Sequence, residues 1–130
     1  MDIEDPQIEK LLSLAWNVRE YAYVLGPTKV GCALLTRKGH FFVGCNVEHR
    51  FRSHDVHAEV NAITNMVSAG HIDLVTVAIA AERERFTPCG ACLDWIFQFG
   101  SEDCRVLSQS SPGGPVKTYL ARELMPHYPK

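Results

Sequence analysis

Three features are missing from this chain of 130 residues: a long apolar run, an excess of basic residues and an internal repeat. Because a membrane-spanning helix needs roughly 20 apolar residues, we expect no membrane partner. Thirteen Lys and Arg against fifteen Asp and Glu give a net charge of −2, which disfavours a polynucleotide partner, since nucleic acids are bound largely through cationic contacts to phosphate. The first fifteen residues lack the basic start and apolar core of a secretion signal, so we expect a cytoplasmic protein.

A disulfide framework is not expected either. The five cysteines are an odd number, and no secretion signal accompanies them. Metal binding or burial in the core is therefore the expected use of these thiols. The length and a hydrophobic content of 46% fit one compact domain over residues 1–130, because a second independent core would need a longer chain.

The hydrophobic pattern alternates along the chain between helical and strand periodicity. Residues 74–81 form a nearly continuous apolar run, rich in β-branched side chains, that is typical of a central strand covered on both faces. Helices are predicted at 6–23, 57–69 and 89–99 with a last helical turn at 119–124, and strands at 30–36, 41–47, 74–81, 105–108 and 116–118. This order predicts an α/β fold, a three-layer α-β-α sandwich with a mixed five-stranded sheet.

Two short motifs, His57-Ala58-Glu59 and Pro88-Cys89-Gly90-Ala91-Cys92, carry the chemistry. Zinc prefers imidazole nitrogen and thiolate sulfur, and a catalytic zinc site uses three protein ligands and keeps a fourth position for water. Cys89 and Cys92 lie one helical turn apart at a predicted helix start, where free N–H groups and the helix dipole favour thiolate. We therefore expect one Zn²⁺ per chain, with His57, Cys89 and Cys92 as its ligands.

Glu59 favours a catalytic over a structural zinc site. It lies two residues beyond His57, close enough to exchange a proton with a metal-bound water without being a ligand. The order H-x-E followed by P-C-x-x-C is the signature of zinc deaminases. A non-catalytic, zinc-stabilised binding module stays open as an alternative. Such a module would not need Glu59, and the other three cysteines fall in segments predicted to be buried strands, so a fourth protein ligand is lacking.

Together with these motifs, the segment VGCALLTRKGHFFVGCNVEH and the ending ELMPHY resemble the cytidine deaminase family over nearly the whole chain. The similarity is greatest to the small homotetrameric zinc nucleoside deaminases, which include blasticidin S deaminase-like members. The resemblance implies a cytidine deaminase-like fold and the hydrolytic deamination of a cytosine nucleoside to the uracil form with release of ammonia. Cytidine, deoxycytidine or a modified cytosine nucleoside would be the substrate, and pyrimidine salvage the role.

The resemblance also implies roles for individual residues. Asn46 and Glu48, in the family's N-x-E motif, would bind the ribose hydroxyls, and the backbone of Ala58 together with Glu59 would bind the pyrimidine edge. An amide and a carboxylate can bind a diol, because they offer both donors and acceptors. Tyr128, in the apolar and aromatic ending, would lie near a substrate pocket in a homotetramer.

Two departures from the family pattern compensate each other. His57 stands where small members usually have Cys, and Val60 stands where they have Arg directly after the Glu. One imidazole and two thiolates around Zn²⁺ form a neutral set, so the nearby guanidinium is no longer required. This compensation indicates a working site.

Two further departures concern the substrate. Thr28 replaces an aromatic ring that family members usually place against the base, and residues 49–55 are rich in Arg and His where the family has small neutral residues. Arg50 and Arg52 could contact a carboxylate or phosphate on a modified nucleoside, so a deaminase of a nucleoside antibiotic of the blasticidin S type stays open. A solvated or subunit-interface loop is the other interpretation of this segment.

Overall fold

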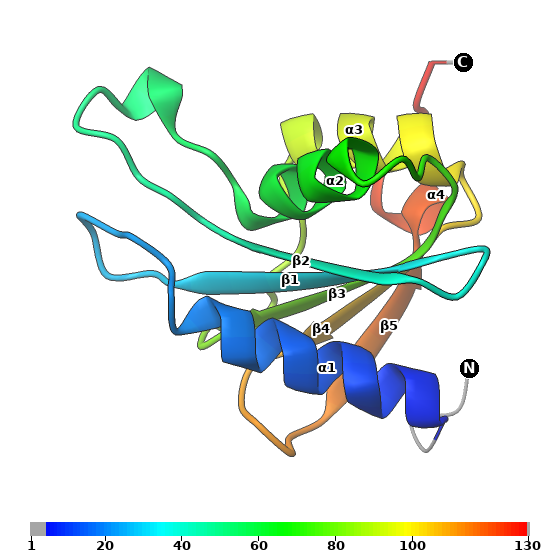
Figure 1. Cartoon of the computed structure of the whole chain (residues 1–130), viewed down its shortest axis with the longest axis horizontal. Helices are drawn as coiled ribbons and strands as arrows, with labels where there is room; N and C mark the ends of the chain where they lie inside the picture. Colours follow the sequence, from blue (N-terminus) through cyan, green and yellow to red (C-terminus); the bar gives the residue numbers. More distant parts are fainter. Residues whose placement is uncertain (1–4, 130) are drawn as a thin grey trace.

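A five-stranded sheet forms the centre of the computed structural model, which describes residues 5–129 (Figure 1). The strands are β1 (Val30–Thr36), β2 (Phe41–Cys45), β3 (Leu74–Ala81), β4 (Arg105–Gln109) and β5 (Val116–Leu120). They lie in the order β2-β1-β3-β4-β5. β3 and β4 run parallel, and the other neighbouring pairs are antiparallel. The sheet is therefore mixed, as predicted.

Helices cover both faces of this sheet. They are α1 (Pro6–Arg19), α2 (Ala58–Ser68), α3 (Gly90–Gly100) and α4 (Ala121–Leu124), and a 3-10 helix, η1 (Arg52–His54), lies in the loop between β2 and α2. Figure 1 shows α1 on one face and α2, α3 and α4 on the other. One buried apolar cluster lies under α1 and contains Leu11 and Ala78, and a second lies under α2 and α3 and contains Ile63, Val77 and Ile96. The predicted three-layer α-β-α sandwich is confirmed.

The ends of several elements differ from the periodicity. The first helix ends at Arg19, before the expected residue 23, because Tyr23 leaves the helical path and forms a β-bridge with Val47. The last strand continues to Leu120 and pairs there with Arg105 of β4, so it takes two residues that the pattern assigned to a helical turn. Within residues 5–129, no helix is both long and apolar enough to cross a membrane.

Two glycines let helices pack closely on the sheet. A Cβ atom on Gly31 in β1 would clash with the carbonyl oxygen of Ala15 in α1. A Cβ atom on Gly44 in β2 would lie only 2.8 Å from the carbonyl oxygen of Ala58 in α2. The bare backbone at Gly44 therefore sets how deeply α2 packs on the sheet, and with it the position of residues 57–59.

Candidate active site

A cleft of about 510 Å³ opens at one edge of the sheet. The start of β1 and the ends of β2 and β3 meet at this edge, because β1 is antiparallel to both of its neighbours. The cleft walls come from the loop before β1, the segment between β2 and α2, and the loop between β3 and α3. Its lining includes His57, Ala58, Glu59 and Cys89, so the two sequence motifs meet in one place.

Three metal-binding atoms come together beside this cleft. His57 is the N-cap of α2, Cys89 is the N-cap of α3, and Cys92 lies in the first turn of α3. The Nδ1 atom of His57 lies 3.2 Å from Cys92 Sγ and 3.4 Å from Cys89 Sγ, and the three ligand atoms all lie within 4.8 Å of one another. Tetrahedral zinc, with bonds of about 2.0–2.1 Å to nitrogen and about 2.3 Å to sulfur, separates such atoms by roughly 3.5 Å. The three residues therefore fit one zinc ion.

A thiolate at Cys92 requires a neighbouring cation in this environment. Burial raises the pKa of this thiol, and the neighbouring Glu59 and Cys89 raise it further. A thiolate at this position needs a metal ion beside it, because coordination deprotonates a thiol outright. Within residues 5–129, these three are the one group of at least three His, Cys, Asp or Glu side chains that is placed to hold a metal.

Glu59 lies in the first turn of α2, and only 3% of the residue is exposed. Burial raises the pKa of its carboxyl group, while a backbone hydrogen bond and the charge of His57 act in the opposite direction. The residue lines the cleft but does not belong to the group of three metal-binding side chains. A carboxyl group of raised pKa beside a ligand set has the properties of a general acid and base.

Asn46 and Glu48 follow β2 and also line the cleft. Asn46 is fixed by the chain before β1: its Oδ1 accepts a hydrogen bond from the Val30 N–H at 2.9 Å, and its Nδ2 donates to the Thr28 carbonyl at 3.0 Å. The Oε1 atom of Glu48 accepts hydrogen bonds from backbone N–H groups of the same loop, at residues 25 and 26. The polar groups expected to bind a sugar are thus held by the protein itself.

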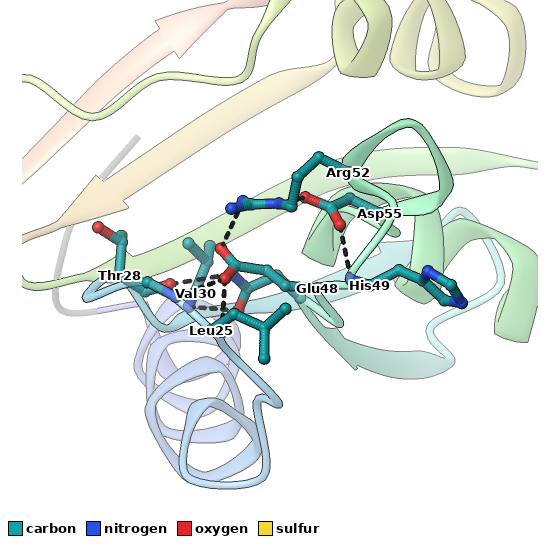
Figure 2. A network of polar contacts seen from close by, with 9 residues as sticks. Leu25, Thr28, Val30, Glu48, His49, Arg52 and Asp55 are labelled. Carbon is teal, nitrogen blue, oxygen red and sulfur yellow. Dashed lines mark hydrogen bonds and ion pairs between the residues drawn. The ribbon is translucent and has the colours of Figure 1, made fainter.

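A network of charged side chains extends from Glu48 into the segment 49–55 (Figure 2). Arg52 lies 3.2 Å from Glu48 Oε2 and 2.8 Å from Asp55 Oδ2, and Asp55 Oδ1 accepts a hydrogen bond from the His49 N–H at 2.7 Å. Backbone hydrogen bonds and Arg52 hold the pKa of Glu48 below its usual value, and the His49 N–H and Arg52 do the same for the pKa of Asp55. Arg52 is therefore a paired cation.

The remaining predicted residues lie in different places. Thr28 and Arg52 line the cleft. Arg50 is not part of that lining, and its guanidinium lies over the ring of Phe51, 5.8 Å from the ring centroid. Tyr128 stacks on Phe97, with 4.2 Å between ring centroids, and lines a second pocket, separate from the cleft.

Asp55, Arg83 and Phe86 are among the cleft residues that the sequence did not single out. Asp55 completes the network with Arg52, and its position three residues after that arginine is a signal for a local ion pair. Arg83 and Phe86 reach the cleft from the loop between β3 and α3. The Ser108 hydroxyl donates a hydrogen bond of 2.8 Å to the Phe86 carbonyl and fixes this loop. No pattern in the sequence indicates that contact.

Residues 5–108 match the family model described as the cytidine and deoxycytidylate deaminase zinc-binding region. The chain belongs to this family. This deaminase is 34% identical over 119 residues to a cytidine deaminase of Sporosarcina psychrophila, covering 90% of this chain and 88% of the relative. It is 36% identical over 97 residues to a probable cytidine deaminase of Dictyostelium discoideum, covering 72% of this chain and 66% of the relative.

The fold of this deaminase also matches solved structures. A crystal structure of cytidine deaminase from Burkholderia pseudomallei superposes with a TM-score of 0.82 at 31% sequence identity, covering 91% of this chain and 95% of the other. The predicted cytidine deaminase-like fold is therefore confirmed. The chain is a zinc-dependent hydrolytic deaminase with one site for the metal ion, formed by His57, Cys89 and Cys92. The alternative of a non-catalytic binding module has no comparable support.

Proposed function

We propose that this deaminase converts cytidine and 2′-deoxycytidine to the corresponding uracil nucleosides with release of ammonia. The observation that carries the proposal is one cleft shared by the metal-binding group, the buried Glu59 and the Asn46–Glu48 pair. The relatives named cytidine deaminase support the same substrates. A nucleoside antibiotic has less support, because Arg52 is already paired with two carboxylates.

Glu59 is the proposed proton carrier. A zinc ion bound by His57, Cys89 and Cys92 would act as a Lewis acid and acidify a water molecule for attack on the ring carbon that carries the amine. Glu59 accepts one proton from the water and passes it to the ring nitrogen. It then accepts the second proton from the hydroxyl group now bonded to the ring carbon and delivers it to the amine, which leaves as ammonia when the carbon–nitrogen bond breaks and the carbonyl forms. Burial raises the pKa of this carboxyl group, which suits both the uptake and the release of a proton.

Substrate binding is assigned to the other walls of the cleft. Asn46 and Glu48 bind the ribose hydroxyls, and the backbone of Ala58 with Glu59 binds the edge of the pyrimidine. Phe86 borders the same cleft and offers an aromatic surface in a structure where Thr28 supplies none. Thr28 and Arg52 would touch the substrate only as parts of the cleft wall. Arg50 would reach the substrate only if its side chain left the Phe51 ring.

We further propose that residues 1–130 form a single domain, that this domain acts in the cytoplasm in pyrimidine salvage, and that it assembles as a homotetramer. Large apolar side chains are exposed beside the cleft at Tyr23, Leu25 and Phe51, each with more than half of its surface accessible. Exposed apolar side chains of this size are candidates for an interface. In the tetramer, Tyr128 lies near the substrate pocket of another subunit.

The replacement Glu59→Gln tests the chemistry, because glutamine keeps the size of the side chain but cannot carry the proton. We expect zinc content and thermal stability close to those of the unmodified enzyme, and ammonia release from cytidine slowed by about 10²-fold or more. Glu9→Gln is the matched control, since Glu9 is also in the first turn of a helix but lies outside the cleft. Unchanged turnover in Glu59→Gln would contradict the assigned role.

A further inference from the structure

The carboxylate of Glu48 is held from two sides. On one side, Oε1 accepts hydrogen bonds from the N–H groups of Leu25 at 2.7 Å and Gly26 at 2.9 Å. On the other side, Oε2 is paired with Arg52 at 3.2 Å. The Glu48 side chain is only 12% exposed, and the residue lines the cleft. The orientation of this carboxylate therefore depends on both the loop before β1 and Arg52.

Arg52 is itself oriented by a second carboxylate. Its Nε atom donates to Asp55 Oδ2 at 2.8 Å, while Asp55 Oδ1 accepts from the His49 N–H. The short helix η1 begins at Arg52 and is capped by Asp55, whose N–H donates to the Arg52 carbonyl, so this one turn brings the two side chains of the ion pair together. In Figure 2 the guanidinium group lies between the two carboxylates. One planar cation thus connects the cleft wall to the segment that leads into His57.

Asn46 shows what a cleft residue looks like without this support. Its amide contacts only backbone groups, the Val30 N–H and the Thr28 carbonyl, so its position does not depend on segment 49–55. Glu48 differs because one of its two oxygen atoms relies on a side chain that is 57% exposed. Without the Arg52 side chain, the two backbone N–H groups would hold the Glu48 carboxylate at Oε1 alone. The carboxylate could then rotate about the terminal bonds of its side chain.

We propose that Arg52 is a positioning residue for nucleoside binding: it holds the Glu48 carboxylate in the orientation that accepts a sugar hydroxyl. This inference rests on the proposed function, in which Glu48 binds the sugar. Arg52 then acts on selectivity for the sugar and not on the chemistry of the base. A direct contact between Arg52 and a substrate anion is the competing explanation, and a neutral nucleoside separates the two.

The test compares kinetics on cytidine and on 2′,3′-dideoxycytidine, which lacks the 2′ and 3′ hydroxyls of the sugar. Arg52→Gln should raise KM for cytidine by about threefold to tenfold, which is the loss expected when an exposed ion pair or a charge-assisted hydrogen bond is removed. The value of kcat should change by less than about twofold. The same variant should change kcat/KM for dideoxycytidine by less than about twofold. Arg122→Gln is the matched control, because Arg122 is 50% exposed and paired with Asp103 outside the cleft.

A double-mutant cycle keeps the test decisive if dideoxycytidine is turned over slowly. In a Glu48→Gln background, Arg52→Gln should have no further effect on KM for cytidine, because the group that Arg52 positions is already changed. Equal losses on both nucleosides, or full additivity of the two replacements, would overturn the proposal. Absence of cytidine turnover in the unmodified enzyme would instead overturn the proposed function, so the two failures are distinguishable.

Discussion

Replacement of Gly44 by alanine tests how the sheet positions the active site. The added Cβ would lie 2.8 Å from both the Ala58 carbonyl oxygen and the Ala62 Cα atom, and closer still to the Ala62 nitrogen. All three are backbone atoms of α2, so no side-chain rotation can relieve the contact. Since unstrained contacts between such atoms begin near 3.5 Å, we expect α2 to move outward by roughly 1 Å.

The shift has two measurable consequences. Overpacking of a close contact costs about 1–3 kcal/mol, which for a domain of this size corresponds to a fall in melting temperature of roughly 4–12 °C. In addition, α2 begins directly after His57 and carries Glu59 in its first turn. A displacement of about 1 Å at reacting groups can reduce the rate by roughly 10²-fold. We therefore expect Gly44→Ala to lower both stability and kcat/KM.

Gly39→Ala separates these consequences. Gly39 lies in the turn between β1 and β2 with φ +89°, and a Cβ there would have no heavy atom within 4 Å. The alanine is strained by its left-handed backbone at a cost of roughly 1 kcal/mol, but α2 does not move. Thermal unfolding, zinc content and nucleoside kinetics should show stability loss alone for Gly39→Ala. If Gly44→Ala is destabilised and yet keeps the kcat/KM of the unmodified enzyme, α2 is not positioned by this contact.

Two other predictions concern the metal and the assembly. Elemental analysis should find one zinc per chain. The double replacement Cys89→Ala with Cys92→Ala should abolish both zinc binding and turnover, because two of the three ligand atoms are then missing. Zinc retained by this variant would contradict the ligand assignment. Light scattering at micromolar concentration should give the mass of four chains, and Phe51→Ser should weaken that assembly, since Phe51 is 62% exposed. A monomer in the unmodified protein would contradict the proposed interface.

The metal site could be predicted because its determinants are local in the sequence. Cys89 and Cys92 are one turn apart, and a helix start brings them to the same side whatever the rest of the chain does. The central strand β3 was equally predictable, since a strand buried on both faces is apolar throughout. The assignment of His57 as the third ligand needed one further assumption, that the starts of α2 and α3 lie close together. They do so because the start of β1 and the ends of β2 and β3 meet at one edge of the sheet.

The cleft walls were less predictable because their contacts join distant segments. Nothing in the pattern around Leu25 and Gly26 indicates that their N–H groups bind the carboxylate of Glu48, more than twenty residues later. The predicted end of the first helix was wrong for the same reason, because Tyr23 forms a β-bridge with the distant Val47. Helical periodicity continues past Arg19, but a tertiary pairing overrides it.

Charge in the segment 49–55 shows how such pairing changes a functional conclusion. From composition alone, Arg50 and Arg52 suggest a basic loop that attracts a substrate anion. In the folded chain, an anion near Arg52 would have to compete with carboxylates at 2.8 and 3.2 Å, both kept ionised by backbone N–H groups. Arg50 lies over an aromatic ring outside the cleft. If Glu48 binds the sugar as proposed, the segment orients that carboxylate through Arg52 and offers little free positive charge, which favours a neutral nucleoside over an anionic one.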